Sequence, residues 1–239
     1  MEKTDRLWPG GYAFLFDDAL FPPSTDTFLL GWFTRTRRGD RVCDLGSGTG
    51  LLGLLLLARR EDLTVTGIEI REAACDLARR TAAFNGLENR LLPVCADLRQ
   101  PGILPGASFD LVVANPPYFS TESGAVSPDP VRGSARSETS CTLEDVCAAA
   151  ERLLRFGGRF SLVFRPERIA ELFEVLRRHR LEPNRLRFVQ NTAASAPSLL
   201  LLECRKGGRP GLSAEPPLLL KDADGRDTEE YDRIYFRIR

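Results

Sequence analysis

A glycine-rich segment from Asp44 to Gly50, which reads Asp-Leu-Gly-Ser-Gly-Thr-Gly, most constrains how this chain can fold. It follows an apolar strand-like run over residues 41–45 and opens an apolar helix-like run over residues 51–58. In α/β domains such a strand–loop–helix junction lies at the carboxyl end of the first strand, where a nucleoside-bearing ligand binds. The segment therefore predicts a parallel sheet with a ligand site at its edge.

The spacing of the glycines narrows the class of ligand. It reads Gly-x-Gly-x-Gly, and Leu51 stands where a dinucleotide-binding fingerprint carries its third glycine. No Gly-Lys-Ser/Thr follows, which excludes a phosphate-gripping P-loop. The segment thus matches neither of these two loops, and its candidate ligand contacts are Asp44, Gly46, Gly48 and Gly50.

A second motif, Asn115-Pro116-Pro117-Tyr118, follows a strand-like run over residues 109–114 and is expected to end at the same edge of the sheet. It suits a planar exocyclic amine, whose delocalised lone pair is a poor nucleophile. The Asn115 side-chain oxygen and the Pro116 carbonyl can accept the two N–H bonds and hold the lone pair towards a methyl donor. The Tyr118 ring can stack on the base that carries this amine. The competing interpretation is a tight turn that closes the strand.

In this order, the two motifs resemble class I S-adenosylmethionine-dependent methyltransferases that modify a planar amine or amide nitrogen. Two acids at strand ends fit the resemblance. Glu69 closes a strand-like run over residues 63–70 and suits the two ribose hydroxyls of the donor. Asp97 follows a run over residues 91–96, where it is expected to meet the donor's adenine amine. For either acid alone, a solvated turn or a helix cap is the alternative.

Strand-like runs alternate with helical patterns along the chain. This predicts an α/β, Rossmann-like class I methyltransferase fold, with a mostly parallel seven-stranded sheet and helices on both faces. We expect a single domain over residues 1–239, with a core at 24–205, a mobile substrate loop at 119–140 and a C-terminal extension at 206–239. Expected strands cover residues 41–45, 63–70, 91–96, 109–114, 159–164, 185–190 and 198–205. Expected helices cover residues 24–37, 51–60, 71–85, 143–155 (stopped by Gly157-Gly158) and 166–178.

The charge balance gives little general attraction for nucleic acid, because the 33 basic side chains equal the 33 acidic ones in number. Residues 132–209, however, hold 15 Lys/Arg against 9 Asp/Glu. This local surplus can meet a phosphate backbone, with Arg136 and Arg165 as candidate contacts, and it predicts binding that weakens steeply with salt.

Cysteine and histidine usage points away from metal and covalent chemistry. The six cysteines show no Cys-x-x-Cys pair and no metal-ligand spacing, which predicts free thiols and no metal. The single histidine, His179, is expected to cap a helix or lie on the surface rather than act as a base. No secretory signal opens the chain and no apolar run is long enough to span a bilayer, which predicts a cytoplasmic location.

Further motifs lie in one order along nearly the whole chain. They are Thr25-Asp26 with Leu29-Leu30, Ala135-Arg136-Ser137-Glu138, Leu143-Glu144-Asp145, Phe164-Arg165-Pro166-Glu167-Arg168, Pro183-x-Arg185-Leu186-Arg187 and Pro216-Pro217-Leu218. Together with the two site motifs, they resemble the bacterial tRNA1(Val) adenine-N6 methyltransferase family. Two departures are Phe21-Pro22-Pro23, in place of a more flexible stretch, and Ser137, where many relatives carry histidine.

The resemblance implies S-adenosylmethionine as cofactor, tRNA as partner, and methylation of the adenine immediately 3′ of the anticodon. It adds Thr25, Asp26 and Asn115 to the expected donor contacts, and it makes Asn115, Pro116 and Tyr118 the catalytic residues that hold the base. We expect no membrane partner, and the oligomeric state, monomer or weak dimer, stays open.

Other functions stay open at this point. A protein glutamine-N5 methyltransferase also uses Asn-Pro-Pro-Tyr, on a side-chain amide. Such enzymes that act on release factors carry a helical substrate domain before the fold, and only 43 residues precede Asp44 here. An rRNA guanine-N2 methyltransferase is a further alternative. A donor-binding scaffold without turnover is the third, although its expected sign is a decayed tetrapeptide and this one is intact.

Overall fold

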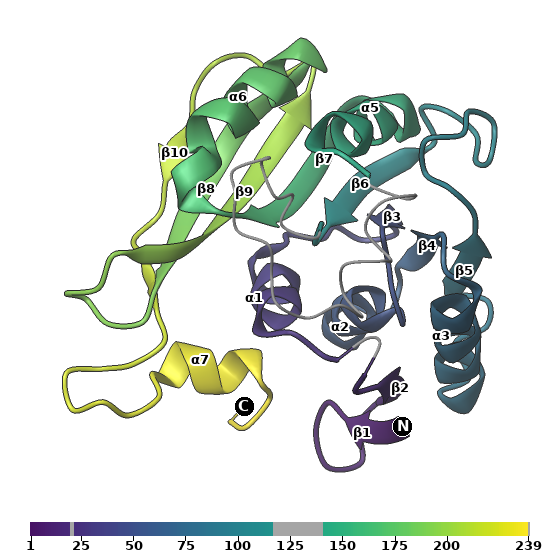
Figure 1. The fold of residues 1–239 in the computed structure, drawn as a ribbon, viewed down its shortest axis with the longest axis horizontal. Helices are drawn as coiled ribbons and strands as arrows, with labels where there is room; N and C mark the ends of the chain where they lie inside the picture. The colour runs from purple at the N-terminus through teal and green to yellow at the C-terminus, as the bar shows by residue number, and fades with distance from the viewer. Residues whose placement is uncertain (20–21, 117–140, 239) are drawn as a thin grey trace.

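One sheet forms the centre of the molecule, a computed structural model that describes residues 1–19, 22–116 and 141–238 (Figure 1). Within these residues the sheet has nine strands. The long strands are β3 (Arg41–Leu45), β4 (Thr64–Glu69), β5 (Leu91–Cys95), β6 (Phe109–Ala114), β7 (Leu154–Phe164), β8 (Leu181–Gln190) and β9 (Pro197–Lys206). The short strands are β10 (Ser213–Ala214) and β11 (Leu218–Leu219), which both pair with β8.

The strand order is β10-β8-β9-β7-β6-β3-β4-β5, and among the described strands of this sheet only β9 runs antiparallel to its neighbours. Strands β3 and β6 are buried along almost their whole length, as expected where helices cover both faces of a parallel sheet. The predicted fold class is therefore confirmed. Parallel strands end at one edge, so Leu45, Glu69 and Ala114 bring the chain to the same side of the sheet.

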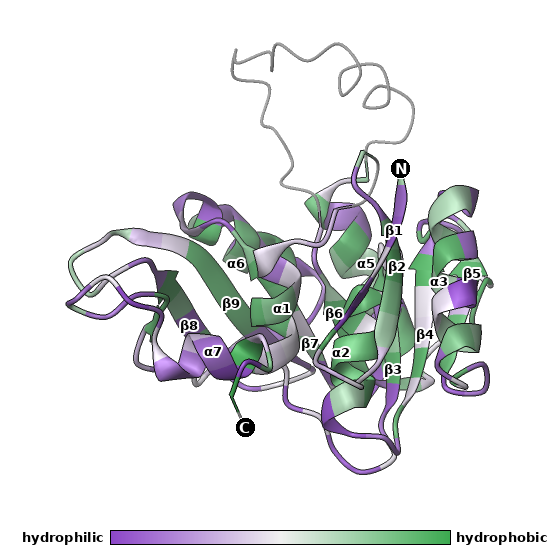
Figure 2. Cartoon of the chain, turned by 90° about the horizontal axis from the view of Figure 1, so that it is seen from below, coloured by the Kyte–Doolittle hydropathy of each residue, from purple (hydrophilic) through white to green (hydrophobic). Residues whose placement is uncertain are grey.

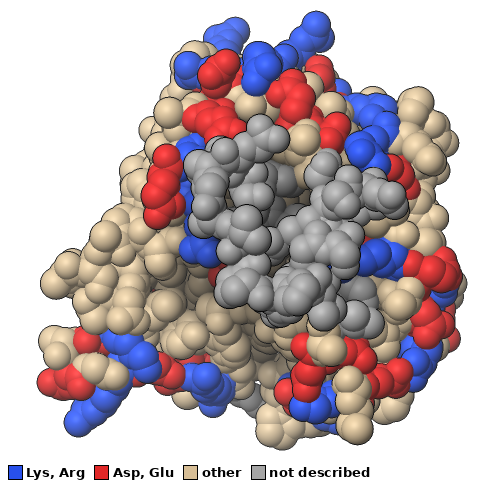
Figure 3. Space-filling view, viewed as in Figure 1, with Lys and Arg blue, Asp and Glu red and all other residues tan. Residues whose placement is uncertain are grey.

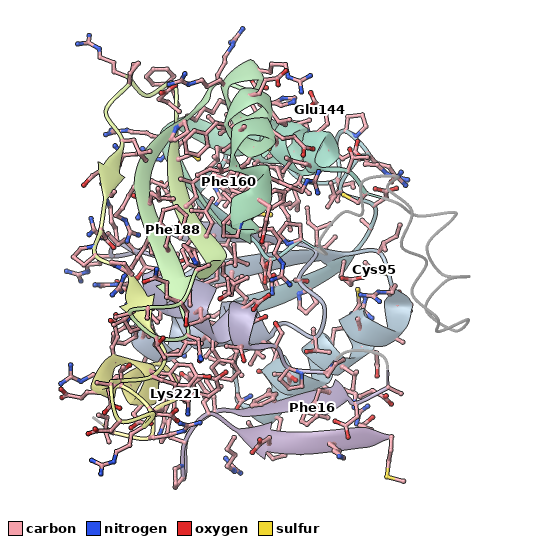
Figure 4. The ribbon with its side chains drawn as sticks, turned by 60° about the vertical axis from the view of Figure 1, so that its left-hand side comes forward. Phe16, Cys95, Glu144, Phe160, Phe188 and Lys221 are labelled. Atoms are coloured by element: carbon pink, nitrogen blue, oxygen red, sulfur yellow. The ribbon has the colours of Figure 1, made fainter. Side chains whose placement is uncertain are left out.

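Helices cover the two faces in separate groups. One core cluster contains residues of α1 (Thr25–Phe33), α2 (Leu51–Arg59) and α3 (Glu72–Phe84). The other contains residues of α5 (Leu143–Leu153) and α6 (Ile169–Arg178), which follows the 3-10 turn η1 (Pro166–Arg168). Phe160 of β7 and Phe188 of β8 belong to this second cluster (Figure 4).

Helix α2 is the most hydrophobic helix of the site region (Figure 2). Every residue from Leu51 to Leu57 is buried, because α1 packs on one side of α2 and β4 on the other. A helix that is apolar all round is stable only in such a position. Burial of each leucine contributes about 1.5–3 kcal/mol, and the helix that begins at the glycine loop is thus firmly held.

An N-terminal hairpin is present that the sequence patterns did not predict. Strands β1 (Glu2–Arg6) and β2 (Ala13–Asp17) pair antiparallel, and β2 packs against α3. Asn85 accepts a hydrogen bond from the Ala13 N–H at 2.8 Å and donates one to the Ala13 carbonyl at 2.7 Å. The Thr81 hydroxyl accepts from the Leu15 N–H at 3.0 Å. The hairpin therefore depends on partners more than sixty residues away.

Two expected helix ends and the expected number of strands were wrong. Helix α1 ends at Phe33 rather than near residue 37, and the Thr34 hydroxyl donates to the Leu30 carbonyl at 2.8 Å. Helix α5 ends at Leu153, and Gly157-Gly158 lie inside β7 rather than stopping the helix. A Cβ at Gly158 would lie 2.9 Å from the Arg155 carbonyl oxygen, where the strand register shifts. The sheet also has nine strands in the described residues instead of seven.

The C-terminal segment joins the fold at two places. Strands β10 and β11 extend the sheet beyond β8, and helix α7 (Glu229–Ile234) packs against α1. The Trp32 indole N–H donates to Glu230 at 2.8 Å. The Tyr235 ring stacks on Phe28 at 4.5 Å, and its hydroxyl donates to Thr25 at 3.1 Å. The segment expected as an appended tail thus contacts the helix that walls the site.

Candidate active site

A cavity of about 260 Å³ lies where β3 and β6 end. Its walls come from the glycine loop, the first turns of α1 and α2, and the residue that follows β6. The lining residues are Pro22, Pro23, Ser24, Thr27, Asp44, Gly46, Ser47, Gly48, Thr49, Leu51, Leu52, Arg71 and Asn115. Of the residues predicted for the site, the cavity therefore brings together Asp44, Gly46, Gly48 and Asn115.

The glycine loop has a backbone that needs its glycines. Gly46, Gly48 and Gly50 have positive φ angles of 70°, 54° and 81°, a region that side chains with a Cβ rarely adopt. The N–H groups of Gly46 and Ser47 both donate to the Ile68 carbonyl, at 2.9 and 3.0 Å. The loop is therefore folded back onto the end of β4.

Gly67 of β4 makes this close approach possible. A Cβ at Gly67 would lie only 2.6 Å from the Ser47 hydroxyl oxygen, so a larger residue would push the loop away. Gly67 is not among the residues that the sequence motifs predicted for the site. Its signal was present, since a glycine inside a strand pattern indicates a site where another backbone approaches closely.

The first turn of α2 offers unused hydrogen-bond donors. Gly50 is its N-cap and has no side chain that could cap the helix. The regular helical bonding starts with the Leu54 N–H, which donates to the Gly50 carbonyl. The N–H groups of Leu51 and Leu52 are thus available beside the cavity, and the helix dipole adds partial positive charge there. Such a terminus favours an anionic group of a ligand.

Asp44 supplies negative charge in the same cavity. It ends β3 and is 2% exposed, and its Oδ2 atom has no hydrogen-bond partner among the described residues. The pKa of Asp44 is raised to about 7, chiefly by burial and secondly by the charge of Glu69, and a hydrogen bond from the Gly53 backbone opposes both. A buried, unpartnered carboxylate oxygen of this kind fits a cationic group of a ligand.

Glu69 has a bracing role that the sequence did not predict. Its Oε2 atom accepts from the Gly48 N–H at 3.0 Å. Its Oε1 atom accepts from the Arg71 N–H at 3.0 Å and from the Arg71 Nε at 3.1 Å. Glu69 is 5% exposed and is not among the lining residues, whereas Arg71 and Gly48 are. The carboxylate therefore ties the glycine loop to the start of α3, and its expected contact with a ribose remains a prediction.

Four other expected ligand contacts lie outside the cavity lining, namely Gly50, Asp97, Thr25 and Asp26. Asp97 accepts two hydrogen bonds from Arg99 Nε, at 2.9 and 3.0 Å, and the Arg99 guanidinium lowers the pKa of Asp97. Thr25 accepts from the Tyr235 hydroxyl. Asp26 lies in the first turn of α1 without lining the cavity. The cavity instead uses their neighbours Ser24 and Thr27.

Asn115 is held in place by those two neighbours. Its Nδ2 atom donates to the Thr27 hydroxyl oxygen at 2.9 Å and lies 3.4 Å from the Ser24 hydroxyl oxygen. Pro116 follows it and is buried. Tyr118, together with the expected loop at 119–140 and Arg136, lies outside the described residues. The sequence showed Ser24 as a helix cap but gave no sign that it meets Asn115.

Most of the described arginines between residues 141 and 209 form ion pairs with acidic side chains. Arg159 pairs with Asp40 at 2.5 Å, and Arg187 makes bonds of 2.6 and 2.7 Å to Glu230. The view in Figure 3 shows basic and acidic side chains interspersed, not gathered into one basic area. The surplus counted in the sequence therefore overstates the positive charge offered to a ligand.

The remaining chemistry-bearing residues lie elsewhere. His179 is the C-cap of α6, as predicted, and its Nε2 lies 2.7 Å from Glu144. All six cysteines are free. The described residues contain no group of three or more side chains suited to a metal ion. Within the same residues, none of the helices combines the length and apolarity needed to cross a membrane.

Comparison with known proteins gives a consistent result. A family model described as methyltransferase small domain matches residues 24–182. The chain is 32% identical over 220 residues to a tRNA1(Val) (adenine(37)-N6)-methyltransferase from Porphyromonas gingivalis, covering 88% of this chain and 85% of that protein. It is 30% identical over 244 residues to the protein of the same name from Dickeya chrysanthemi, covering 98% and 95%.

Solved structures agree on the fold. A crystal structure described as a predicted O-methyltransferase from Agrobacterium tumefaciens superposes with a TM-score of 0.72 at 23% identity, covering 89% of this chain and 96% of that one. The structure of TrmN from Thermus thermophilus gives a TM-score of 0.53 at 22% identity, covering 75% and 48%. The family model, the relatives matched along most of their length and the shared fold lead to one conclusion: the chain belongs to the methyltransferase small domain family, together with the tRNA1(Val) (adenine(37)-N6)-methyltransferases.

Proposed function

We propose that this protein transfers a methyl group from S-adenosylmethionine to the N6 atom of an adenine in tRNA, next to the anticodon, in the cytoplasm. The observation that carries the proposal is the position of Asn115, at the wall of the cavity that also contains Asp44 and the glycine loop. An amide oxygen there can hold an amine beside a donor bound in the same cavity. The names of the curated relatives supply the substrate.

The cavity has groups that fit the methionine part of the donor. S-adenosylmethionine, when bound, supplies a methyl group on a positively charged sulfur. The orphaned Oδ2 of Asp44 suits the ammonium group of the methionine part, and the free N–H groups of Leu51 and Leu52 suit its carboxylate. Glu69 and Asp97 keep the expected roles at the ribose and the adenine, and the positive φ angles at Gly46 and Gly48 let the backbone approach the ligand.

The chain's contribution to the transfer is positioning. Asn115 Oδ1 and the Pro116 carbonyl accept the two N–H bonds of the adenine amine, which turns its lone pair towards the donor. These acceptors also stabilise the positive charge that develops on the nitrogen. Tyr118 stacks on the base. No strong base is needed, because the amine attacks as a neutral group.

The choice of tRNA over the other substrates rests on the relatives and not on the site residues. A glutamine side-chain amide or a guanine N2 amine offers the same two N–H donors, so Asn115 and Pro116 alone do not choose among them. The relatives matched at 27–32% identity over most of the chain favour tRNA. They give no support to the glutamine or rRNA alternatives.

The direct test is incubation of the protein with labelled S-adenosylmethionine and total bacterial tRNA, followed by digestion to nucleosides. We expect label in N6-methyladenosine. Label in N2-methylguanosine from rRNA, or in a release factor but not in RNA, would redirect the assignment. In the same assay Asn115→Ala should lower the rate at least about a hundredfold, while the donor still binds.

A further inference from the structure

The side-chain amide of Asn115 meets two hydroxyl groups that come from a distant part of the chain. Thr27 and Ser24 lie at the start of α1, 88 and 91 residues before Asn115. The Nδ2 atom of Asn115 is 2.9 Å from Thr27 Oγ1 and 3.4 Å from Ser24 Oγ. The two hydroxyl oxygens are themselves 2.9 Å apart. All three side chains line the cavity.

In this arrangement the nitrogen of the Asn115 amide faces the two hydroxyl groups. The terminal torsion of an asparagine is broad and roughly two-fold, so an unrestrained amide presents its oxygen or its nitrogen about equally readily. The nitrogen can only donate, and two hydroxyl oxygens are placed to accept from it. With the nitrogen held against α1, the oxygen occupies the other side of the amide. An acceptor, not a donor, then faces a ligand amine.

We propose that Thr27, assisted by Ser24, is a positioning residue that sets the orientation of the Asn115 amide and so prepares it to accept an N–H bond of the substrate. The inference rests on the proposed function, because it assigns Thr27 to the same transfer step. Thr27 itself does not touch the reacting amine. It acts through Asn115, and its loss lets the amide turn over.

Thr27 is a better test position than Ser24. Ser24 is also the N-cap of α1 and accepts from the Thr27 N–H at 3.3 Å, so its replacement would disturb the helix as well. Thr27→Val removes only the hydroxyl and keeps the shape, and Thr27→Ser restores a hydroxyl. Thr34→Val is a matched control, because Thr34 is buried at the other end of α1 and its hydroxyl also makes one hydrogen bond.

The first measurement needs no substrate. The chain has five asparagines, so protein labelled with ¹⁵N-asparagine gives few side-chain amide signals in an NMR spectrum. The Asn115 pair is identified by its loss in Asn115→Ala. We expect Thr27→Val to move this pair towards the shifts of free asparagine, while Thr27→Ser and Thr34→Val leave it in place. An unmoved pair in Thr27→Val would overturn the proposal.

The second measurement is single-turnover methyl transfer to total bacterial tRNA with labelled S-adenosylmethionine. Thr27→Val should slow transfer about tenfold, the scale of one lost hydrogen bond, with donor affinity by calorimetry unchanged. Thr27→Ser should stay within about twofold of the wild type, as should Thr34→Val. In an Asn115→Ala background, Thr27→Val should cost nothing further, because its effect passes through the missing amide.

An equal loss from Thr27→Val in both backgrounds would overturn the positioning role. If the wild-type protein transfers no methyl group to tRNA, the proposed function fails. The amide spectrum then still decides whether Thr27 orients Asn115.

Discussion

Asp44 shows at the scale of a single residue how burial changes the chemistry of a side chain. Its carboxyl group lies at the end of β3 with one oxygen unpartnered, and its pKa is raised to about 7 by burial and then by Glu69. A protonated Asp44 cannot attract a cation, whereas the ionised form is costly until a cation arrives. The residue therefore couples ligand binding to pH near neutrality.

The sign of the pH dependence follows from this pKa. The folded protein holds the Asp44 proton more tightly than the unfolded chain, so the stabilising contribution of the neutral carboxyl is complete below about pH 4. That contribution falls as the pH rises to about 7 and is then lost. Donor affinity should change in the opposite direction and rise up to about tenfold per pH unit before levelling above about pH 7.

Calorimetry of S-adenosylmethionine binding and thermal unfolding between pH 5 and 8 measure the two effects. Asp44→Asn keeps the shape of the side chain and should make both profiles flat. Profiles that are as steep in Asp44→Asn as in the wild type would assign the pH dependence to another group.

At the scale of elements, the shape of the site depends on contacts that join β4, the glycine loop and the start of α3. Gly67 lets Ser47 approach β4, the Ile68 carbonyl accepts from the loop, and Glu69 ties Gly48 to Arg71. These contacts are made by three consecutive residues of β4, Gly67, Ile68 and Glu69. The loop shape is therefore dictated by β4 as much as by the loop's own glycines.

Gly67→Ala tests this dependence. The new Cβ would lie 2.6 Å from Ser47 Oγ, so the loop must move, and overpacking of this kind costs about 1–3 kcal/mol. We expect donor affinity to fall about tenfold or more. Ser47→Gly in the same chain removes the clashing atoms and should restore most of it. Unchanged donor affinity in Gly67→Ala alone would contradict this account.

The elements that could be predicted from the sequence are those with a local pattern. The apolar runs of β3 and β6 and the glycine loop signalled the fold and the position of the cavity. The β1 strand carries no such signal, because all five of its residues are exposed and its hairpin is held by Thr81 and Asn85. The Thr27–Asn115 contact was equally hidden, since it forms only when α1 and the end of β6 meet in the fold.

At the scale of the whole molecule, buried charges connect the sheet to the segments on either side of it. Arg185 of β8 lies between Glu203 of β9 and Glu215, at 3.3 and 3.2 Å, and donates to the Phe33 carbonyl at 2.7 Å. Its guanidinium also lies 3.7 Å from the Phe33 ring centre. One side chain thus joins α1, two strands and the C-terminal segment.

Arg185→Ala should therefore lower the free energy of unfolding by about 3–5 kcal/mol, because it leaves Glu203 buried without its partner. Arg38→Ala is the matched control, since that side chain is 94% exposed, and it should change stability by less than about 0.5 kcal/mol. Urea unfolding measures both. A loss as small as that of the control would show that the cluster contributes little.

The same pairing bears on how the protein meets RNA. Many of the described arginines between residues 141 and 209 already have acidic partners, which leaves fewer of them to release counterions from a phosphate backbone. The residue count suggested that RNA binding weakens steeply with salt. We instead expect the affinity for tRNA to fall only gradually as the salt concentration rises. The slope of log affinity for tRNA against log salt concentration should be weaker than about −4, corresponding to roughly four phosphates. Filter binding between about 50 and about 200 mM salt measures this slope. A steeper slope would show that the paired arginines still contact the RNA backbone.

The contact between α7 and α1 has a genetic consequence. The Tyr235 hydroxyl donates a hydrogen bond to Thr25, and Glu230 accepts one from Trp32. The C-terminal residues therefore contact α1, the helix that begins at the Ser24 cap and contains Thr27. A late stop codon, such as one after Arg226, would spare the sheet core and the glycine loop. We nevertheless expect such a mutation to be a loss-of-function allele and not a silent one. The purified truncated protein should transfer methyl groups more slowly than the full chain.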